Sequence, residues 1–175
     1  MTYKPTSKDK TAVFLSLILA FACIFLLYFS SVFAVYPMIF QIIALFFAVF
    51  ALQIYLKYIY SNYVYEACEN DLKIYRISDK KSICVCSLSY EESTSKVFSS
   101  EYYETHKSEL PKVRISTNFC KNIFPKDYYL YYFNFNSKQA SLKFEPDEIF
   151  VKFLNEKIEN ALLRKERFEN SDYGL

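Results

Sequence analysis

The hydrophobic pattern divides the chain into an uncharged N-terminal block and a longer region of short alternating segments. Residues 12–56 contain no Asp, Glu, Lys, Arg or His. Because one helix needs about 20 apolar residues to cross a bilayer, this block is long enough for two helices. A break near Ser30 and Pro37 separates them, and Pro37 suits the first turn of the second helix. We predict a transmembrane hairpin over 12–57, with spans at about 12–33 and 38–57.

Small residues in both spans predict how the two helices pack. If the chain reverses between the spans, antiparallel pairing brings several small side chains opposite one another. Small side chains let helix backbones approach closely in lipid. Alanine is also common in such helices, which leaves the alternative that the pattern carries no packing information. The predicted packing residues are Ser16, Ala20, Cys23, Ala44, Ala48 and Ala51.

Basic residues beside the block predict its orientation. Three lysines precede the block and Lys57 follows it, and such residues are retained on the cytoplasmic side. We expect an inner-membrane, multi-pass protein with both termini in the cytoplasm and a tail at 1–11. A cleaved signal peptide is the alternative, because Val32-Phe33-Ala34 resembles a cleavage site. The apolar stretch is longer than is usual for such a peptide, and a second span follows at once.

Beyond Tyr58 the apolar period changes from helical to two, which is typical of strands. Val113, Ile115 and Thr117, for example, alternate with polar neighbours. The pattern predicts a cytoplasmic α+β domain over 58–168 with about seven antiparallel strands in a barrel or curved sheet. The strands are expected at about 62–69, 72–77, 82–88, 96–103, 113–119, 128–136 and 139–145.

One amphipathic helix is predicted to follow, at about 147–167, with a tail at 169–175. Pro146 suits a helix start, and Asp147 complements the positive end of the helix. Apolar residues recur along the segment with helical period and can cover one opening of the sheet. A coiled-coil dimer is the alternative use of this stripe, although only about two heptads are present.

Three C-terminal segments carry a family resemblance: the strand 128–135, the strand 140–144, and the helix entry Phe144-Glu-Pro-Asp-Glu-Ile-Phe150. With the order of the other elements, they resemble bacterial two-span membrane proteins with pleckstrin-homology-like (PH-like) domains, including the YcxB-like group. The chain departs from that pattern in having no Trp and a single glycine, Gly174. The resemblance implies a cytoplasmic PH-like domain behind a membrane hairpin.

Charge and composition exclude several classes of function. The chain holds 21 basic and 19 acidic residues, and its basic excess lies beside the uncharged block. The remainder is nearly neutral, so we expect no nucleic-acid partner. A single glycine leaves no phosphate-binding loop, and His106 is the only histidine, so a nucleophile with a histidine base is not expected. We predict no enzymatic activity, no catalytic residue and no cofactor.

The five cysteines, Cys23, Cys68, Cys84, Cys86 and Cys120, are predicted to be reduced thiols in a cytoplasmic domain and a span. Cys84 and Cys86 share one face of a predicted strand, which could begin a metal site. No histidine pair and no C-x-x-C spacing completes that site. We therefore expect no bound metal.

Basic residues near the second predicted strand are candidate contacts to an anionic lipid surface. The resemblance implies that PH-like domains bind phosphoinositides through basic pockets near the first strand turn. That turn is acidic here, at Glu69-Asn70-Asp71, so we do not expect this mode of binding. Ordinary solvated turn charges are the alternative. The candidate lipid contacts are Lys73, Arg76, Lys80 and Lys81.

The aromatic strand at 128–135 has two faces with different predicted roles. One face carries Tyr131 and Phe133 and is predicted to be core. An aromatic platform for a peptide or partner helix is the alternative for that face. The opposite face holds the candidate partner contacts Tyr128, Tyr132 and Asn134.

These features favour a non-catalytic integral membrane protein whose PH-like domain scaffolds or regulates a protein partner. The short join between Leu56 and the first strand would hold the domain close to the bilayer. Another copy of the chain is a further candidate partner. One alternative is an anionic-lipid-interacting domain, and another is an accessory subunit of a membrane enzyme or transporter.

Overall fold

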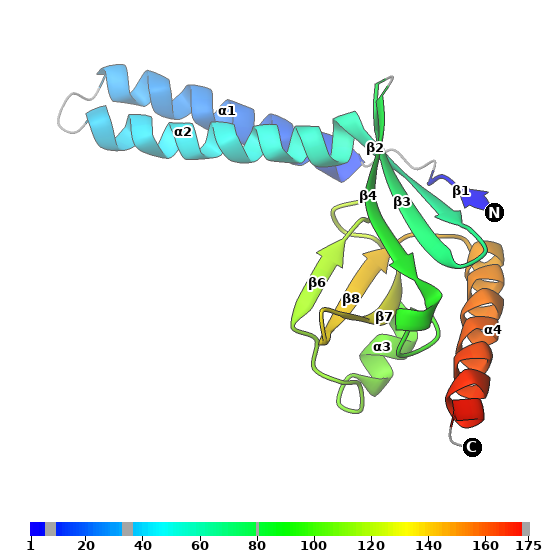
Figure 1. The fold of residues 1–175 in the computed structure, drawn as a ribbon. Helices are drawn as coiled ribbons and strands as arrows, with labels where there is room; N and C mark the ends of the chain where they lie inside the picture. The colour runs from blue at the N-terminus through cyan, green and yellow to red at the C-terminus, as the bar shows by residue number, and fades with distance from the viewer. Residues whose placement is uncertain (6–9, 33–36, 80, 173–175) are drawn as a thin grey trace. The chain divides into compact units, whose positions relative to one another are not determined.

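The structure, a computed structural model, describes residues 1–5, 10–32, 37–79 and 81–172 (Figure 1). The chain separates into two compact units. The hairpin unit holds the two apolar helices, and the domain unit holds most of the strands and the C-terminal helix.

The hairpin unit is built on α1 (Lys10–Val32) and α2 (Pro37–Ile54), and a π-helical segment, Tyr55–Tyr60, continues α2. Both helices are long and apolar enough to cross a membrane. Most of their large apolar side chains are exposed, which suits helices that face lipid. The predicted reversal of the chain and most of the Val32-Phe33-Ala34 motif lie outside the described residues.

The first sheet of the domain has four strands in the order β1-β2-β3-β4. The N-terminal segment adds an edge strand to this sheet instead of forming the expected free tail. Thr2 pairs with Glu66 and Tyr3 with Tyr65 in antiparallel register. A strand of two residues is too short to show an alternating pattern in the sequence. The strands are β1 (Thr2–Tyr3), β2 (Ser61–Ala67), β3 (Asp71–Ser78) and β4 (Lys81–Ser89).

The second sheet has the order β5-β7-β8-β6, so the described residues form eight strands in two sheets instead of about seven in one. β7 and β8 are joined by a two-residue turn at Asn136 and Ser137, whose φ angles of 49° and 60° suit a tight hairpin. β6 runs parallel to β8, so the expectation of only antiparallel pairing is wrong. The strands are β5 (Phe98–Ser99), β6 (Ile115–Asn118), β7 (Tyr129–Phe135) and β8 (Lys138–Phe144).

The strand expected at 96–103 is mostly wrong, because only Phe98–Ser99 is extended and α3 (Ser100–His106) follows at once. The Ser99 hydroxyl accepts a hydrogen bond from the Tyr102 backbone N–H at 3.3 Å, which is a typical helix N-cap. This local cap outweighs the weak strand pattern.

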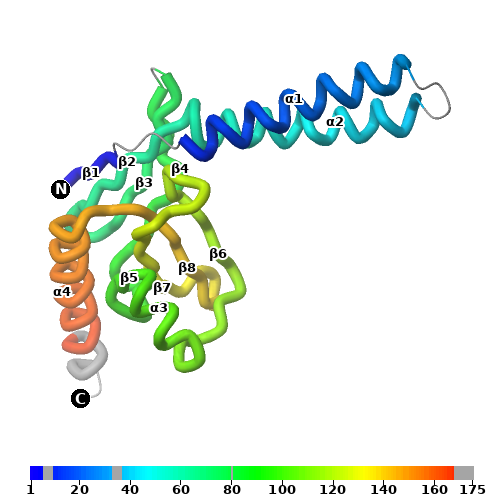
Figure 2. The backbone as a smooth tube through the Cα atoms, turned by 180° about the vertical axis from the view of Figure 1, so that it is seen from behind, coloured from blue at the N-terminus to red at the C-terminus, as the bar shows by residue number. Residues whose placement is uncertain are grey.

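The C-terminal helix, α4 (Glu148–Asp172), extends past the predicted end at residue 167. Asp147 caps it, because its carboxylate accepts a hydrogen bond from the Phe150 backbone N–H at 2.8 Å. Within the domain, α4 lies beside the sheets (Figures 1 and 2), and its apolar stripe joins one core with both of them. The fully buried large residues of this core include Tyr65, Tyr90, Leu72, Ile74, Tyr131, Leu142, Phe144, Phe150, Leu154 and Ile158.

Candidate functional site

A groove of about 320 Å³ opens on the face of β7 and β8 that points away from the core. Tyr131 and Leu142 point into the core, so their neighbours Leu130 and Ser141 occupy the other face. We call this cavity the sheet groove. Its polar and aromatic lining comes from β6, β7, β8, α3 and the residue before β7: Tyr103, Ser116, Tyr128, Tyr132, Ser141 and Lys143.

The sheet groove is rich in hydrogen-bond donors. The Lys143 ammonium lies 3.5 Å from the centre of the Tyr128 ring, which is a close cation–π contact. Burial, and next the charge of Glu104, raises the pKa of Tyr128. Burial also raises the pKa of Tyr132, so both phenols are protonated at neutral pH. None of the residues that line the groove is acidic, so it can receive carbonyl, carboxylate or other acceptor groups.

Phe98 of β5 and Tyr102 of α3 form an aromatic cluster with Tyr132 of the sheet groove. The Phe98 ring packs against the Tyr132 ring at 5.2 Å between centroids, in an edge-to-face arrangement. Phe98 also contacts Tyr102 of α3, with 5.6 Å between ring centroids. Tyr132 is therefore only 4% exposed. It is a fixed part of the groove floor, and Tyr128 is the more accessible aromatic residue.

Two of the three predicted partner contacts, Tyr128 and Tyr132, line the sheet groove. Asn134 is exposed but does not line it. Sequence reasoning missed Lys143 and Tyr103. The tight β7–β8 turn sets Lys143 opposite Leu130, so the hairpin register could have indicated Lys143. Tyr103 reaches the groove through α3, which the sequence did not predict.

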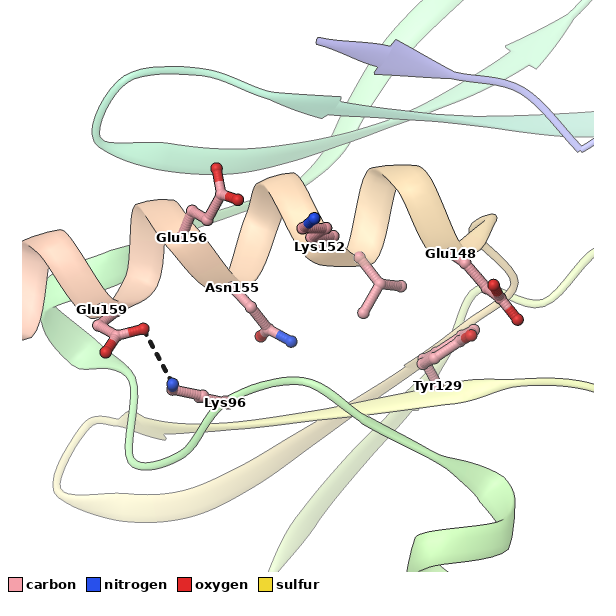
Figure 3. Close-up of a pocket in the computed structure, with 8 residues that line it drawn as sticks. Lys96, Tyr129, Glu148, Lys152, Asn155, Glu156 and Glu159 are labelled. Atoms are coloured by element: carbon pink, nitrogen blue, oxygen red, sulfur yellow. Dashed lines mark hydrogen bonds and ion pairs between the residues drawn. The ribbon is translucent and has the colours of Figure 1, made fainter.

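A second, more open groove of about 450 Å³ runs beside α4 (Figure 3). Its side chains carry mixed charge, and the Lys96 ammonium forms an ion pair with Glu159 at 2.9 Å. The Asn155 amide, which lines this groove, accepts a hydrogen bond from the Val97 N–H at 2.7 Å and donates one to the Val97 carbonyl at 3.0 Å. Both backbone groups of Val97 are therefore already used, which disfavours addition of a peptide strand at that residue.

The predicted lipid contacts do not form one cluster. The Lys73 ammonium pairs with the Asp71 carboxylate at 3.4 Å, and that charge raises the pKa of Lys73. Arg76 and Lys81 are exposed at the other end of the β3–β4 hairpin, where Arg76 lies opposite Ile83. Lys80 lies outside the described residues.

The predicted packing residues of the hairpin unit differ in burial. Ala44 is 1% exposed, and Phe29 of α1 meets Phe40 of α2 edge to face at 5.4 Å. Ala20 and Ala48 are exposed, because the buried stripe recurs at alternating steps of three and four and leaves them at its margin. The half-buried residues of the predicted set are Ser16, Cys23 and Ala51.

None of the residues that line the sheet groove is His, Cys, Asp or Glu. Within the described part of the chain, no three His, Cys, Asp or Glu side chains gather as metal ligands would. His106 stacks on Tyr102 with 4.1 Å between ring centres, and its Nδ1 lies 2.8 Å from the Thr105 hydroxyl. These contacts give His106 a role within α3.

Two sheets closed by one C-terminal helix, behind two apolar helices, define a PH-like domain joined to a candidate membrane hairpin. The chain matches the family described as "Bacterial PH-like domain (DUF6106)" over residues 2–164, and it belongs to this family. The resemblance to bacterial PH-like domains is thereby confirmed. Comparisons with curated proteins and with solved structures gave no match.

Proposed function

We propose that the chain is a non-catalytic protein of the inner membrane, whose PH-like domain binds a protein partner beside the bilayer. The two helices cross the membrane as a hairpin, both termini face the cytoplasm, and the sheet groove is the contact surface. If the partner is a membrane enzyme or transporter, the chain is its accessory subunit.

The pairing of β1 with β2 is the observation that carries the proposed two-span topology. The Met1 ammonium donates to the Ala67 carbonyl at 2.9 Å, and the Ala67 N–H donates to the Met1 carbonyl at 2.8 Å. Residues before and after the two apolar helices thus belong to one sheet. A membrane crossed once would separate these residues, so the pairing supports an even number of crossings.

The end of the second helix has the composition of a membrane interface. Tyr55 stacks near Tyr60 at 6.4 Å, and the Lys57 ammonium lies 5.1 Å from the centre of the Tyr58 ring. Tyrosine is enriched where a helix meets the headgroups, and lysine is retained on the cytoplasmic side. Both features support a span that ends near Tyr60 at the inner face.

The composition of the sheet groove supports a protein partner. Tyrosine combines a large apolar ring with a hydroxyl, and it is enriched at the centres of protein interfaces. Tyr103, Tyr128 and Tyr132 all line the groove, with Lys143 as its cation. An open groove of this kind suits a side chain or loop of a partner that presents acceptor groups.

Reporter fusions test the topology. Alkaline phosphatase fused after residue 34 should be active, because it would lie outside, and the same enzyme fused after Leu175 should be inactive. A green fluorescent protein at Leu175 should fluoresce, as it does in the cytoplasm. Equal phosphatase activity at both positions would refute the two-span topology.

Cross-linking in cells tests the partner surface. Full-length protein should yield a defined cross-linked complex that Tyr128→Ala and Lys143→Glu each reduce at least several-fold. Phe135→Ala is the matched control, because Phe135 is exposed at the end of the same strand and does not line the groove. Recovery of the chain only alone, or equal loss in the control, would count against this surface.

A further inference from the structure

The far half of the β3–β4 hairpin exposes apolar side chains. Every residue of β4 from Lys81 to Val85 is exposed, with Ile83 at 51% and Val85 at 36%. The near half of the hairpin supplies the buried core residues Leu72, Ile74 and Leu88. We call residues 75–79 and 81–85 the hairpin arm.

A β-bulge marks the base of the hairpin arm. Ile74 pairs with Cys86 and Tyr75 pairs with Cys84, so Val85 has no partner on β3. Such a bulge bends the strand and strengthens its twist. β4 is also an edge of its sheet. Natural edges are commonly guarded by charge or cover, whereas this one presents Ile83 and Val85.

The covalent chain relates the hairpin arm to the end of the second candidate span. Ser61 begins β2 and directly follows Tyr60, the last residue of that span. β2 and β3 are neighbours joined by a short turn at residues 68–70. The last residues of β3 and the first residues of β2 are therefore at the same end of this sheet.

The charges of the hairpin arm suit an anionic surface. Arg76 lies opposite Ile83, and Lys81 lies opposite Ser78 at the tip. Arg76 and Lys81 are exposed, as is one acidic residue of the tip, Asp79. Basic residues beside exposed apolar residues, on a hairpin that follows a candidate span in the chain, are typical of a segment that lies in the headgroup region.

We infer that the hairpin arm lies against an anionic bilayer, with Ile83 and Val85 at the boundary of the acyl chains and Arg76 and Lys81 at the phosphates. The inference rests on the proposed two-span insertion. It assigns the bilayer to a different surface from the sheet groove, so the domain can hold a partner and the membrane at once.

Tryptophan probes test the contact, because the natural chain has no Trp. The full chain with Ile83→Trp is reconstituted in vesicles of equal parts phosphatidylcholine and phosphatidylglycerol, with lipids brominated near the top of the acyl chain. We expect strong quenching and a blue shift of its emission. Val85→Trp is a second probe in case the first variant folds poorly.

Two matched probes separate this inference from the proposed function. Phe46→Trp, at a position 62% exposed near the middle of the second span, reports insertion of the span in matching vesicles whose lipids are brominated near the end of the acyl chain. Leu163→Trp, at a position 47% exposed on α4, reports the domain surface and should not be quenched. An unquenched Phe46→Trp would overturn the two-span insertion. A quenched Phe46→Trp with unquenched probes at 83 and 85 would overturn only the hairpin-arm contact.

Charge reversal tests the role of the anionic lipid. Arg76→Glu with Lys81→Glu, in the Ile83→Trp background, should reduce quenching at least twofold in the mixed vesicles. In vesicles of phosphatidylcholine alone, the same change should have a smaller effect. Equal effects in both kinds of vesicle would overturn the assignment of an anionic surface.

A second copy of the chain is the competing occupant of the hairpin arm. Cys84 is exposed on the arm, so a short bismaleimide added to the reconstituted protein would join two copies through Cys84 if their arms were paired. We expect little dimer, and Cys84→Ser should not change its amount. Efficient cross-linking that Cys84→Ser abolishes would overturn the bilayer contact in favour of a dimer.

Discussion

The β7–β8 hairpin and the β3–β4 hairpin have similar lengths, yet they differ in how far their apolar residues are buried. β7–β8 pairs without interruption from Tyr129–Phe144 to Phe135–Lys138, and it buries Tyr131, Phe133 and Leu142 in the core. β3–β4 is broken by a bulge and leaves Ile83 and Val85 exposed. The first hairpin supplies core residues, and the second leaves apolar residues exposed to solvent or a partner.

The difference follows from the place of each hairpin in its sheet. β7 and β8 are the two central strands, with β5 and β6 as neighbours, whereas β4 is an edge strand. The inner face of a central strand is covered along its length, but an edge strand is covered only where another element reaches it. Similar apolar sequences therefore acquire structural or binding roles according to their neighbours.

Truncation of one apolar side chain in each hairpin should give the largest contrast. Leu142→Ala should lower the free energy of unfolding by about 2–5 kcal/mol, because it leaves a cavity in the core. Ile83→Ala should change it by less than about 0.5 kcal/mol, because that side chain is exposed. Denaturant unfolding of the full chain in detergent, followed by tyrosine circular dichroism, measures both. Similar losses would contradict the contrast.

Thiol labelling should show that Cys86, on the core side of the bulge in β4, is protected by burial. Burial raises the pKa of the half-buried Cys86 to about 11, so at pH 8 only about a thousandth of it is the reactive thiolate. Its labelling rate should rise about tenfold per pH unit between pH 8 and 10. Labelling of Cys84→Ser with a small maleimide measures this rate, and Cys86→Ser is the control. A rate that levels off between pH 8 and 10, as for an exposed thiol, would contradict burial of Cys86.

Glycine in the two hairpin turns should give the smallest effect. Ser137→Gly should stabilise the domain by about 0.5 kcal/mol, because its φ of 60° is left-handed and favours glycine. Asp79→Gly is the matched change, at a φ of 55°. It should stabilise less, because the hairpin arm can open before global unfolding. The denaturation midpoints measure both, and an equal gain would show that the arm unfolds with the core.

Local sequence patterns predicted most helices and strands, but not every helix or the way in which every strand pairs. The alternation over 128–136 and 139–145 predicted both strands of the β7–β8 hairpin, and Asp147 marks the start of α4. α3 was missed because its signal is a single serine cap at Ser99. The parallel pairing of β6 was missed because the direction of a strand depends on its neighbour.

The sheet groove was predicted only in part for the same reason. Tyr128 and Tyr132 are on one face of a strand, which alternation alone reveals. Lys143 and Tyr103 come from other elements, and only the folded sheet and α3 bring them to the same cavity. A site assembled from several elements is not contained in the pattern of any one of them.

The amino-acid sequence by itself determined the uncharged block, the alternating domain and the amphipathic C-terminal helix, because each depends on a period that local residues set. Only the tertiary structure decided that Thr2 and Tyr3 join β2, that Phe98 packs on Tyr132, and that Ile83 remains exposed. These outcomes depend on contacts between segments far apart in the chain, where the gain from burial must exceed the entropy lost on closing the loop between them.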